Sequence, residues 1–189
     1  MTLMPMTLPG MDSPIEMLTA CHQKVRHFAR LSGKLAAHLE SSGADKDAQE
    51  AARNILRYFD TAGPLHHQDE EDDLFPALRE AAVSKGDTPD MQALCSAIAE
   101  VQAEHAVLDT LWDEVRAWLE RVEQGHSNPA PSGVEIFAVQ YPMHAGREEA
   151  EIYIHARLLT EPQLARIGRR MSERRGLRCD ASDPPVAGA

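Results

Sequence analysis

The sequence predicts an all-α fold, an up-down-up-down four-helix bundle followed by a short C-terminal fifth helix. The composition favours helix over strand, because Ala, Leu, Glu and Arg are abundant and aromatic residues make up only 5% of the chain. Apolar residues recur at alternating steps of three and four along four long segments, which is the period of a helix with one buried face. Short connections between these segments make neighbouring helices antiparallel.

Capping and terminating residues set the bounds of the four bundle helices. Ser13-Pro14-Ile15-Glu16 opens the first helix and Ser132-Gly133-Val134-Glu135 the fourth, since each places a capping serine three residues before a glutamate. Thr88-Pro89 gives the third helix a cap followed by a first-turn proline. The expected helices are 13–40, 45–84, 89–124 and 132–160, within a bundle domain of residues 13–160.

The second helix contains two prolines, and both ends of the chain are expected to lie outside the bundle. Pro64 and Pro76 each remove a backbone donor and should bend the second helix or break it locally, so a pair of helices is the alternative there. Glu161-Pro162 predicts a short helix over residues 161–175, followed by a disordered tail over 176–189. Residues 1–12 are expected to be a flexible leader, without the cationic start and apolar core of a signal peptide.

Charge and cysteine usage narrow the setting. The formal net charge of −11 argues against binding nucleic acid or an anionic membrane surface. No stretch approaches the roughly 20 apolar residues that span a bilayer. Cys21, Cys95 and Cys179 are far apart and odd in number, which is typical of free thiols in a reducing compartment, so we expect a cytoplasmic protein.

Each of the four bundle helices carries a histidine on its apolar stripe, and two helices add a glutamate one turn further on. His66 precedes Glu70 and His144 precedes Glu148 by four residues, which puts each pair on one helix face. Counting residues to the helix ends places all of these groups at roughly one depth of the bundle. The six residues are His22, His66, Glu70, His105, His144 and Glu148.

A buried ionised carboxylate costs several kcal/mol unless a cation or a hydrogen-bond network compensates it, and a pair of metal ions compensates both glutamates at once. Imidazole and carboxylate ligands without thiolate suit iron, zinc or manganese. We therefore expect four terminal histidine ligands and bridging glutamates Glu70 and Glu148. Two octahedral ions so held, with a bridging oxygen, keep roughly two positions for water or a small ligand.

The motifs carry a family resemblance. The run from His66 to Pro76, HHQDEEDDLFP, is similar to the H-x-x-x-E-E-x-x-L-F-P signature of hemerythrin-like, HHE cation-binding domains. His22, Glu104-His105 and the run from His144 to Glu149 match the other motifs in order and spacing, over about residues 13–160. The resemblance implies two non-haem iron ions, with zinc or manganese as substitutes, in a protein that binds dioxygen or senses iron, oxygen or nitric oxide.

The chain also departs from the oxygen carriers of this family. Their third helix carries a second histidine, where this chain has Val101 and Asp109 four residues to either side of His105. Their last helix carries an aspartate five residues after its histidine, where this chain has Glu149. We therefore expect a more open or labile site than one for stable oxygen carriage.

Other polar residues are given lesser roles. His67 and Glu71 lie off the stripe and would replace its ligands if the second helix is rotated by about 100°. Whether His67, Glu71, Glu149 or Asp109 also binds metal stays open. Tyr58 is a candidate hydrogen-bond donor to the site or a packing residue, and His155 is expected in the core. Surface positions are expected for three histidines, for three aspartates on a solvated acidic face and for an arginine cluster: His27, His38 and His126; Asp69, Asp72 and Asp73; Arg166, Arg169, Arg170, Arg174 and Arg175.

Three functions compete at this stage. A protein that binds or senses dioxygen or another small diatomic ligand should change its optical spectrum without turnover. A di-iron oxidoreductase acting on peroxide or nitric oxide should turn over with an electron donor. An iron store or a metal-stabilised interaction module is the third, and a homodimer is compatible with each.

Overall fold

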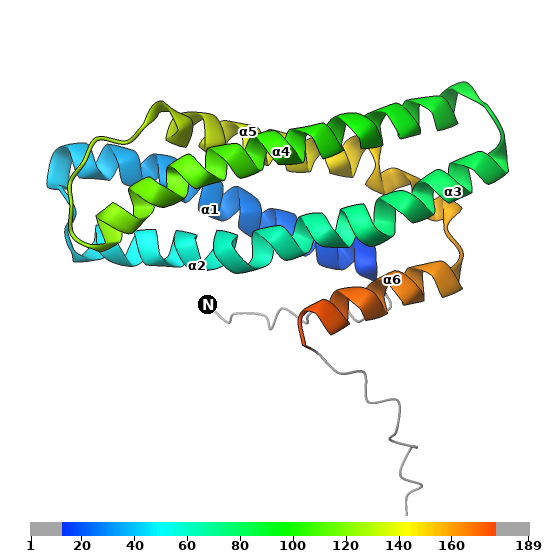
Figure 1. Ribbon diagram of the computed structural model, residues 1–189, viewed down its shortest axis with the longest axis horizontal. Helices are drawn as coiled ribbons and strands as arrows, with labels where there is room; N and C mark the ends of the chain where they lie inside the picture. Colours follow the sequence, from blue (N-terminus) through cyan, green and yellow to red (C-terminus); the bar gives the residue numbers. More distant parts are fainter. Residues whose placement is uncertain (1–12, 177–189) are drawn as a thin grey trace, which may run out of the picture.

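The structure, a computed structural model, describes residues 13–176, and within them the helices form the bundle that the sequence predicts (Figure 1). α1 (Pro14–Ser42) packs on α2 (Lys46–Asp69) and α5 (Ser132–Glu151), and α4 (Pro89–Glu123) packs on the same two helices. The described residues contain no strand, so the all-α prediction is confirmed. The expected leader, residues 1–12, and residues 177–189 of the expected tail lie outside the described residues.

The second predicted helix is continuous, but its winding changes at Glu70. α2 runs through Pro64 without a break, and a π-helical segment, η1 (Glu70–Leu74), joins it to α3 (Phe75–Lys85). The N–H of Phe75 donates to the carbonyl of Glu70, five residues back, and Pro76 follows with no N–H to donate. Neither proline therefore breaks the helix, and Gly86, with φ of 88°, ends α3.

The fourth predicted helix is shorter than expected. α5 ends at Glu151 and not near residue 160, and a 3₁₀ segment, η2 (Tyr153–Leu158), follows it. Because a 3₁₀ helix turns about 120° per residue instead of 100°, side chains beyond Ile152 leave the stripe that the α-helical period predicts. The short helix α6 (Glu161–Arg174) then folds back below α3 and contacts α1, α2 and η1 (Figure 1).

This return of α6 overturns the expected acidic face. Asp69 is fully buried and Asp73 nearly so, while Asp72 is exposed as expected. Arg174 Nη1 donates to Asp69 Oδ1 at 2.9 Å, and Arg175 Nη2 donates to Asp69 Oδ2 at 2.6 Å. Two arginines assigned to a charged helix surface thus clamp α6 to the end of α2, because a buried carboxylate needs paired hydrogen bonds.

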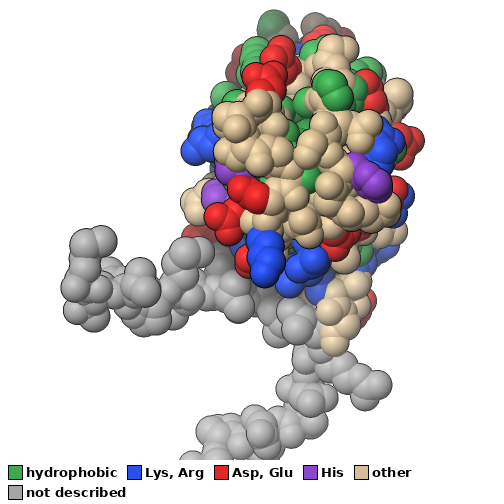
Figure 2. Space-filling view, turned by 90° about the vertical axis from the view of Figure 1, so that its left-hand side faces the viewer, with side chains coloured by type: hydrophobic (Ala, Val, Ile, Leu, Met, Phe, Trp, Pro, Cys, Tyr) green, Lys and Arg blue, Asp and Glu red, His purple; other side chains and the backbone are tan. Residues whose placement is uncertain are grey.

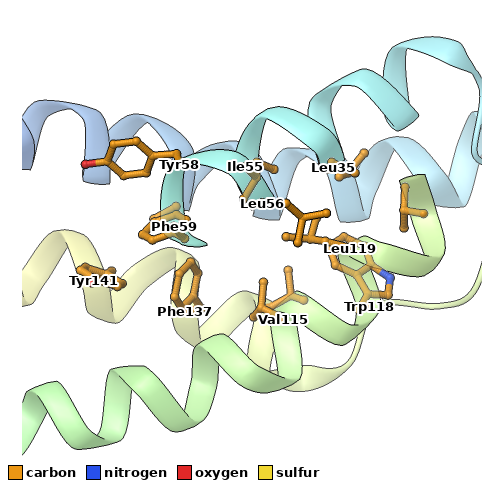
Figure 3. Close-up of a cluster of buried hydrophobic side chains, with 14 of the residues drawn as sticks. Leu35, Ile55, Leu56, Tyr58, Phe59, Val115, Trp118, Leu119, Phe137 and Tyr141 are labelled. Atoms are coloured by element: carbon orange, nitrogen blue, oxygen red, sulfur yellow. The ribbon is translucent and has the colours of Figure 1, made fainter. Parts of the chain in front are cut away.

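The interior consists of two hydrophobic clusters separated by a polar layer. On each bundle helix the site histidine lies between residues of one cluster and residues of the other, as in the order Leu18, His22, Val25 along α1. In the larger cluster, drawn in Figure 3, Phe59 and Phe137 face each other between α2 and α5, with ring centroids 4.9 Å apart. The layer is therefore sealed from both ends of the bundle by apolar side chains.

The surface carries charges of both signs. At the bundle end shown in Figure 2, acidic and basic side chains are interspersed around hydrophobic ones. Among the described helices, none is both long and apolar enough to cross a membrane.

Candidate metal centre

The polar layer brings together all six predicted site residues and one more histidine. Each of these side chains is at most 8% exposed, and three of them are fully buried. They come from α1, α2, η1, α4 and α5, so every helix of the bundle contributes. The members of the layer are His22, His66, His67, Glu70, His105, His144 and Glu148.

The layer divides into two groups of ligand atoms. One group holds His22 and His66 with both glutamates, and the other holds His67, His105 and His144. Within each group the ligand atoms lie within 4.8 Å of one another. Histidine and carboxylate donors at this spacing can hold a metal ion, so the layer offers two adjacent cation sites.

Glu148 connects the two groups. Its Oε2 lies 3.1 Å from His22 Nε2 in the first group. Its Oε1 lies 3.1 Å from His144 Nε2 and 3.3 Å from His105 Nε2 in the second. One carboxylate oxygen thus faces each group, which is the arrangement that lets a carboxylate bridge two cations.

Glu70 lies between the groups as well. Its Oε2 is 3.7 Å from His66 Nε2 in the first group and 3.6 Å from His105 Nε2 in the second. The π-helical segment begins at this residue, so the change of winding falls where the side chain must reach both groups. The two glutamates predicted to bridge are therefore the two that face both groups of imidazoles.

Several buried ligand atoms of the layer lie close together without forming hydrogen bonds to one another. Glu148 Oε2, Glu70 Oε2 and His144 Nε2 are buried, and none has a hydrogen-bond partner among the described residues despite the short distances. Neighbouring donors on one octahedral ion, at about 2.1 Å from it, lie about 3.0 Å apart. The His22 Nε2 to His66 Nε2 distance of 3.0 Å and the contacts of 3.1 Å fit that spacing. The residues present therefore fit a metal pair.

A ring of partly exposed carboxylates orients the histidines from outside. The Nδ1 atoms of three imidazoles donate to glutamates: His22 to Glu149 at 2.9 Å, His105 to Glu71 at 2.7 Å and His144 to Glu104 at 2.8 Å. His67 Nδ1 lies 3.6 Å from Asp109. A carboxylate on Nδ1 fixes the tautomer that presents Nε2 inward and raises its basicity, as is usual for metal-bound histidines.

The remaining candidate ligands lie partly inside the layer and partly outside it. Glu71, Glu149 and Asp109 lie outside the layer and contact histidine Nδ1 atoms. His67 lies in the layer together with His66, without a rotation of α2 that would remove His66 from it. Consecutive helical residues point about 100° apart, and a layer wide enough for two cations spans that angle. His155, half-buried, lies outside both groups, and His27 and His126 are exposed as expected.

Two of the three tyrosines contact the layer, and Tyr58 has the packing role that the sequence offers as one alternative. Tyr58 donates to the carbonyl of Cys21 at 3.0 Å and so packs without reaching the ligands. Tyr141, at the end of the cluster in Figure 3, lies 2.9 Å from His67 Nε2. Tyr153 donates to Glu70 Oε1 at 2.5 Å and lies 3.2 Å from His22 Nε2. The helical stripe contains Tyr141 but not Tyr153, which follows the departure from α-helical geometry at Ile152, with φ of −116°.

The buried ionisable groups of the layer have shifted pKa values, and a bound cation would offset the repulsion between the carboxylates. Burial, and then the charge of Glu148, raise the pKa of Glu70 well above its usual range. Burial would raise the pKa of Glu148 too, but the close approach of His105, His144 and His22 holds it well below its usual range. Burial and the neighbouring His22 lower the pKa of His66. Without a cation, the two buried carboxylates therefore cannot both ionise easily.

Two comparisons with known proteins find relatives of this chain. The family model described as "Hemerythrin HHE cation binding domain" matches residues 13–156, which include every residue of the layer. An uncharacterized protein of Haemophilus influenzae is 33% identical over 174 residues, covering 92% of this chain and 96% of that protein.

Proposed function

Because this chain belongs to the hemerythrin HHE cation-binding domain family, we propose that it holds two non-haem iron ions and binds dioxygen or a related small ligand. We place this activity in the cytoplasm, in oxygen, redox or iron sensing or handling. The binding of metal cations follows from the family and from the histidine and glutamate groups. The identity of the metal, its number and the small ligand are the proposal.

The observation that carries the proposal is the position of Glu148. Its two oxygens face different groups of imidazoles at 3.1–3.3 Å, so one side chain serves two cations. The donor set is nitrogen and oxygen with no thiolate, which iron accepts in both its ferrous and ferric states. Zinc or manganese would suit the same atoms as substitutes.

The two ions would not be equivalent. His67, His105 and His144 with two bridging glutamates offer one ion five donors, whereas His22 and His66 with the same glutamates offer the other four. A bridging oxygen would complete six positions at the first ion and leave one open at the second. A di-iron centre with an open position supplies the redox chemistry that binding or reducing a small oxygen or nitrogen species requires.

The protein's own side chains set the surroundings of that position. Leu18 and Phe75, both fully buried, belong to the cluster that closes one side of the layer, so bulk water is excluded there. The outer glutamates hold the imidazoles in fixed orientations before any ligand arrives. A small site in an apolar interior admits diatomic molecules and excludes larger substrates, which favours binding or sensing over chemistry on a metabolite.

The test is metal analysis of full-length protein purified without affinity metals and loaded with ferrous iron under argon. We expect about two irons per chain, and an optical change on exposure to air that needs no electron donor. Glu148→Gln should lower the iron content to about one or less, whereas Glu135→Gln, an exposed carboxylate on the same helix, should keep two. Wild-type protein that keeps fewer than two irons, or sustained turnover with peroxide or nitric oxide, would contradict the proposal.

A further inference from the structure

We propose that Tyr153 is a further ligand of this centre, its phenol oxygen binding the ion that is held by His22 and His66. The inference rests on the proposed di-iron function and adds an anionic oxygen donor to the half of the site that has fewer imidazoles. Tyr153 would fill the open position at that ion until a small ligand binds.

The first argument is that the phenol oxygen of Tyr153 lies close to two members of the layer. Tyr153 Oη lies 2.5 Å from Glu70 Oε1 and 3.2 Å from His22 Nε2, so it contacts two residues of the same group. The 3.2 Å contact fits the spacing of about 3.0 Å between neighbouring donors on one octahedral ion, whereas the 2.5 Å contact is a hydrogen bond to the second oxygen of Glu70. The phenol oxygen thus lies among the ligand atoms and not behind them.

The second argument concerns the hydrogen atoms. Glu149 accepts the proton that His22 carries on Nδ1, so the Nε2 atom of a neutral His22 presents a lone pair. Tyr153 has one hydroxyl proton, which it donates to Glu70. Its oxygen and His22 Nε2 therefore face each other with lone pairs at 3.2 Å, a contact that a shared cation turns from repulsive to attractive.

The third argument is that the ring is held in place. Tyr153 is 5% exposed, and its ring stacks on that of His22 with centroids 5.2 Å apart and planes 8° apart. Ile152 and Leu159, both buried, anchor the segment on either side. The packing of η2 consequently holds the hydroxyl at the edge of the polar layer.

Comparison with Tyr141 sharpens the assignment. Tyr141 is also buried, but the structure gives its oxygen one contact with the layer, His67 Nε2 at 2.9 Å, and none with a carboxylate there. Tyr141 lies beside the ion with three imidazoles, whose positions are already filled by histidines and glutamates. The two tyrosines thus lie at opposite halves of the centre, and only the half with Tyr153 has a position to fill.

Ligation has a chemical consequence for iron. When the ion binds, the phenol oxygen forms a bond to the metal, and its proton leaves to solvent. A phenolate is a hard anionic donor, so it favours the ferric over the ferrous ion. A small molecule that binds at this ion must then displace Tyr153 or bind after reduction has weakened the bond, which gives the site a built-in preference for the reduced state.

The experiment uses the full chain loaded with ferrous iron under argon and then oxidised in air, with iron content measured on every sample. A phenolate bound to ferric iron gives a visible charge-transfer band and resonance-enhanced phenol ring vibrations in the Raman spectrum. We expect both in the wild type, and their loss in Tyr153→Phe with about two irons retained. Tyr141→Phe and Tyr58→Phe, matched buried controls, should keep both signals.

The design also covers a Tyr153→Phe variant that fails to fold. The chain has three tyrosines, so ring-deuterated tyrosine in the wild type together with the two control variants identifies the ligand by elimination. Two irons with no phenolate vibrations, or vibrations lost in Tyr141→Phe or kept in Tyr153→Phe, overturn the inference and leave the proposed function intact. A wild type that binds no iron overturns the proposed function and the inference together.

Discussion

Replacing Glu149 by glutamine isolates the contribution of the outer carboxylates to metal binding. Glu149 accepts from His22 Nδ1 at 2.9 Å and from Arg26 through two bonds of 2.9 and 2.8 Å. Glutamine keeps the volume and one acceptor oxygen but loses the charge that fixes the His22 tautomer. Loss of such a partner lowers metal affinity by about 10–100-fold, and the retained acceptor places Glu149→Gln near tenfold, or about 1.4 kcal/mol.

The assay is a competition titration of the metal-free protein with a chromophoric chelator, using ferrous or zinc ions, which resolves the two binding steps. Only the dissociation constant of the weaker binding step should change. This step is assigned to the ion with fewer imidazoles, and Glu149 contacts a histidine of that group alone. The matched control is Glu123→Gln, which breaks an ion pair with Arg53 of 2.9 Å on a carboxylate of similar exposure, 34% against 31%. Equal effects of the two substitutions, or an unchanged weaker step in Glu149→Gln, would refute the reasoning.

Three other predictions concern stability. Asp69→Asn should lower the free energy of unfolding by about 3–5 kcal/mol because it removes the fully buried carboxylate that Arg174 and Arg175 share, and Arg175 pairs with no other carboxylate among the described residues. Asp72→Asn, 47% exposed, should cost under about 1 kcal/mol; urea unfolding curves check both, and similar costs would show that α6 is not clamped by Asp69. Trp118→Ala should cost about 3–5 kcal/mol by opening a cavity in the larger cluster, yet retain full iron content on metal analysis. Burial would raise the pKa of Glu104, but His144 and Arg147 hold this pKa below its usual 4.5. Ionised Glu104 therefore contributes fully to the stability of the metal-free protein above pH 4.5, and this contribution is lost as the pH falls through the lowered pKa. Urea unfolding at a series of acidic pH values should therefore show a shallower loss in Glu104→Gln, and parallel curves would contradict this.

What the sequence predicts well is what depends on local helix geometry. The pairs His66–Glu70 and His144–Glu148 follow from the four-residue repeat of a helix, and both pairs lie in the buried layer. The depth of each histidine follows from counting residues to the helix ends. His67 lies off the predicted stripe because the period assigns one direction per helix, whereas the layer, with two groups of ligand atoms, is wider than one residue.

What the sequence does not predict depends on changes of winding and on distant parts of the chain. Tyr153 lies five residues after Glu148, which on a regular α-helix points it away from the layer, but the backbone leaves α-helical geometry at Ile152, with φ of −116°, just before it. Asp69 looked solvated because its partners, Arg174 and Arg175, lie more than a hundred residues later. A proline close to an acidic run is a usable signal, since Pro76 lies two residues after the end of the π-helical segment.

The two shells of carboxylates explain how the bundle tolerates so polar an interior. Glu70 and Glu148 are fully buried, whereas Glu71, Glu104 and Glu149 keep 31–40% of their side chains exposed. Each imidazole paired with an outer glutamate therefore spans from solvent to the centre, with its charged partner hydrated on one side and a cation on the other. Only the inner pair lacks hydration, so the folding cost of the layer is concentrated in the two residues that face both groups of imidazoles. Metal binding and the packing of this layer are consequently one equilibrium, and chelation should loosen the layer before it affects the cluster around Trp118.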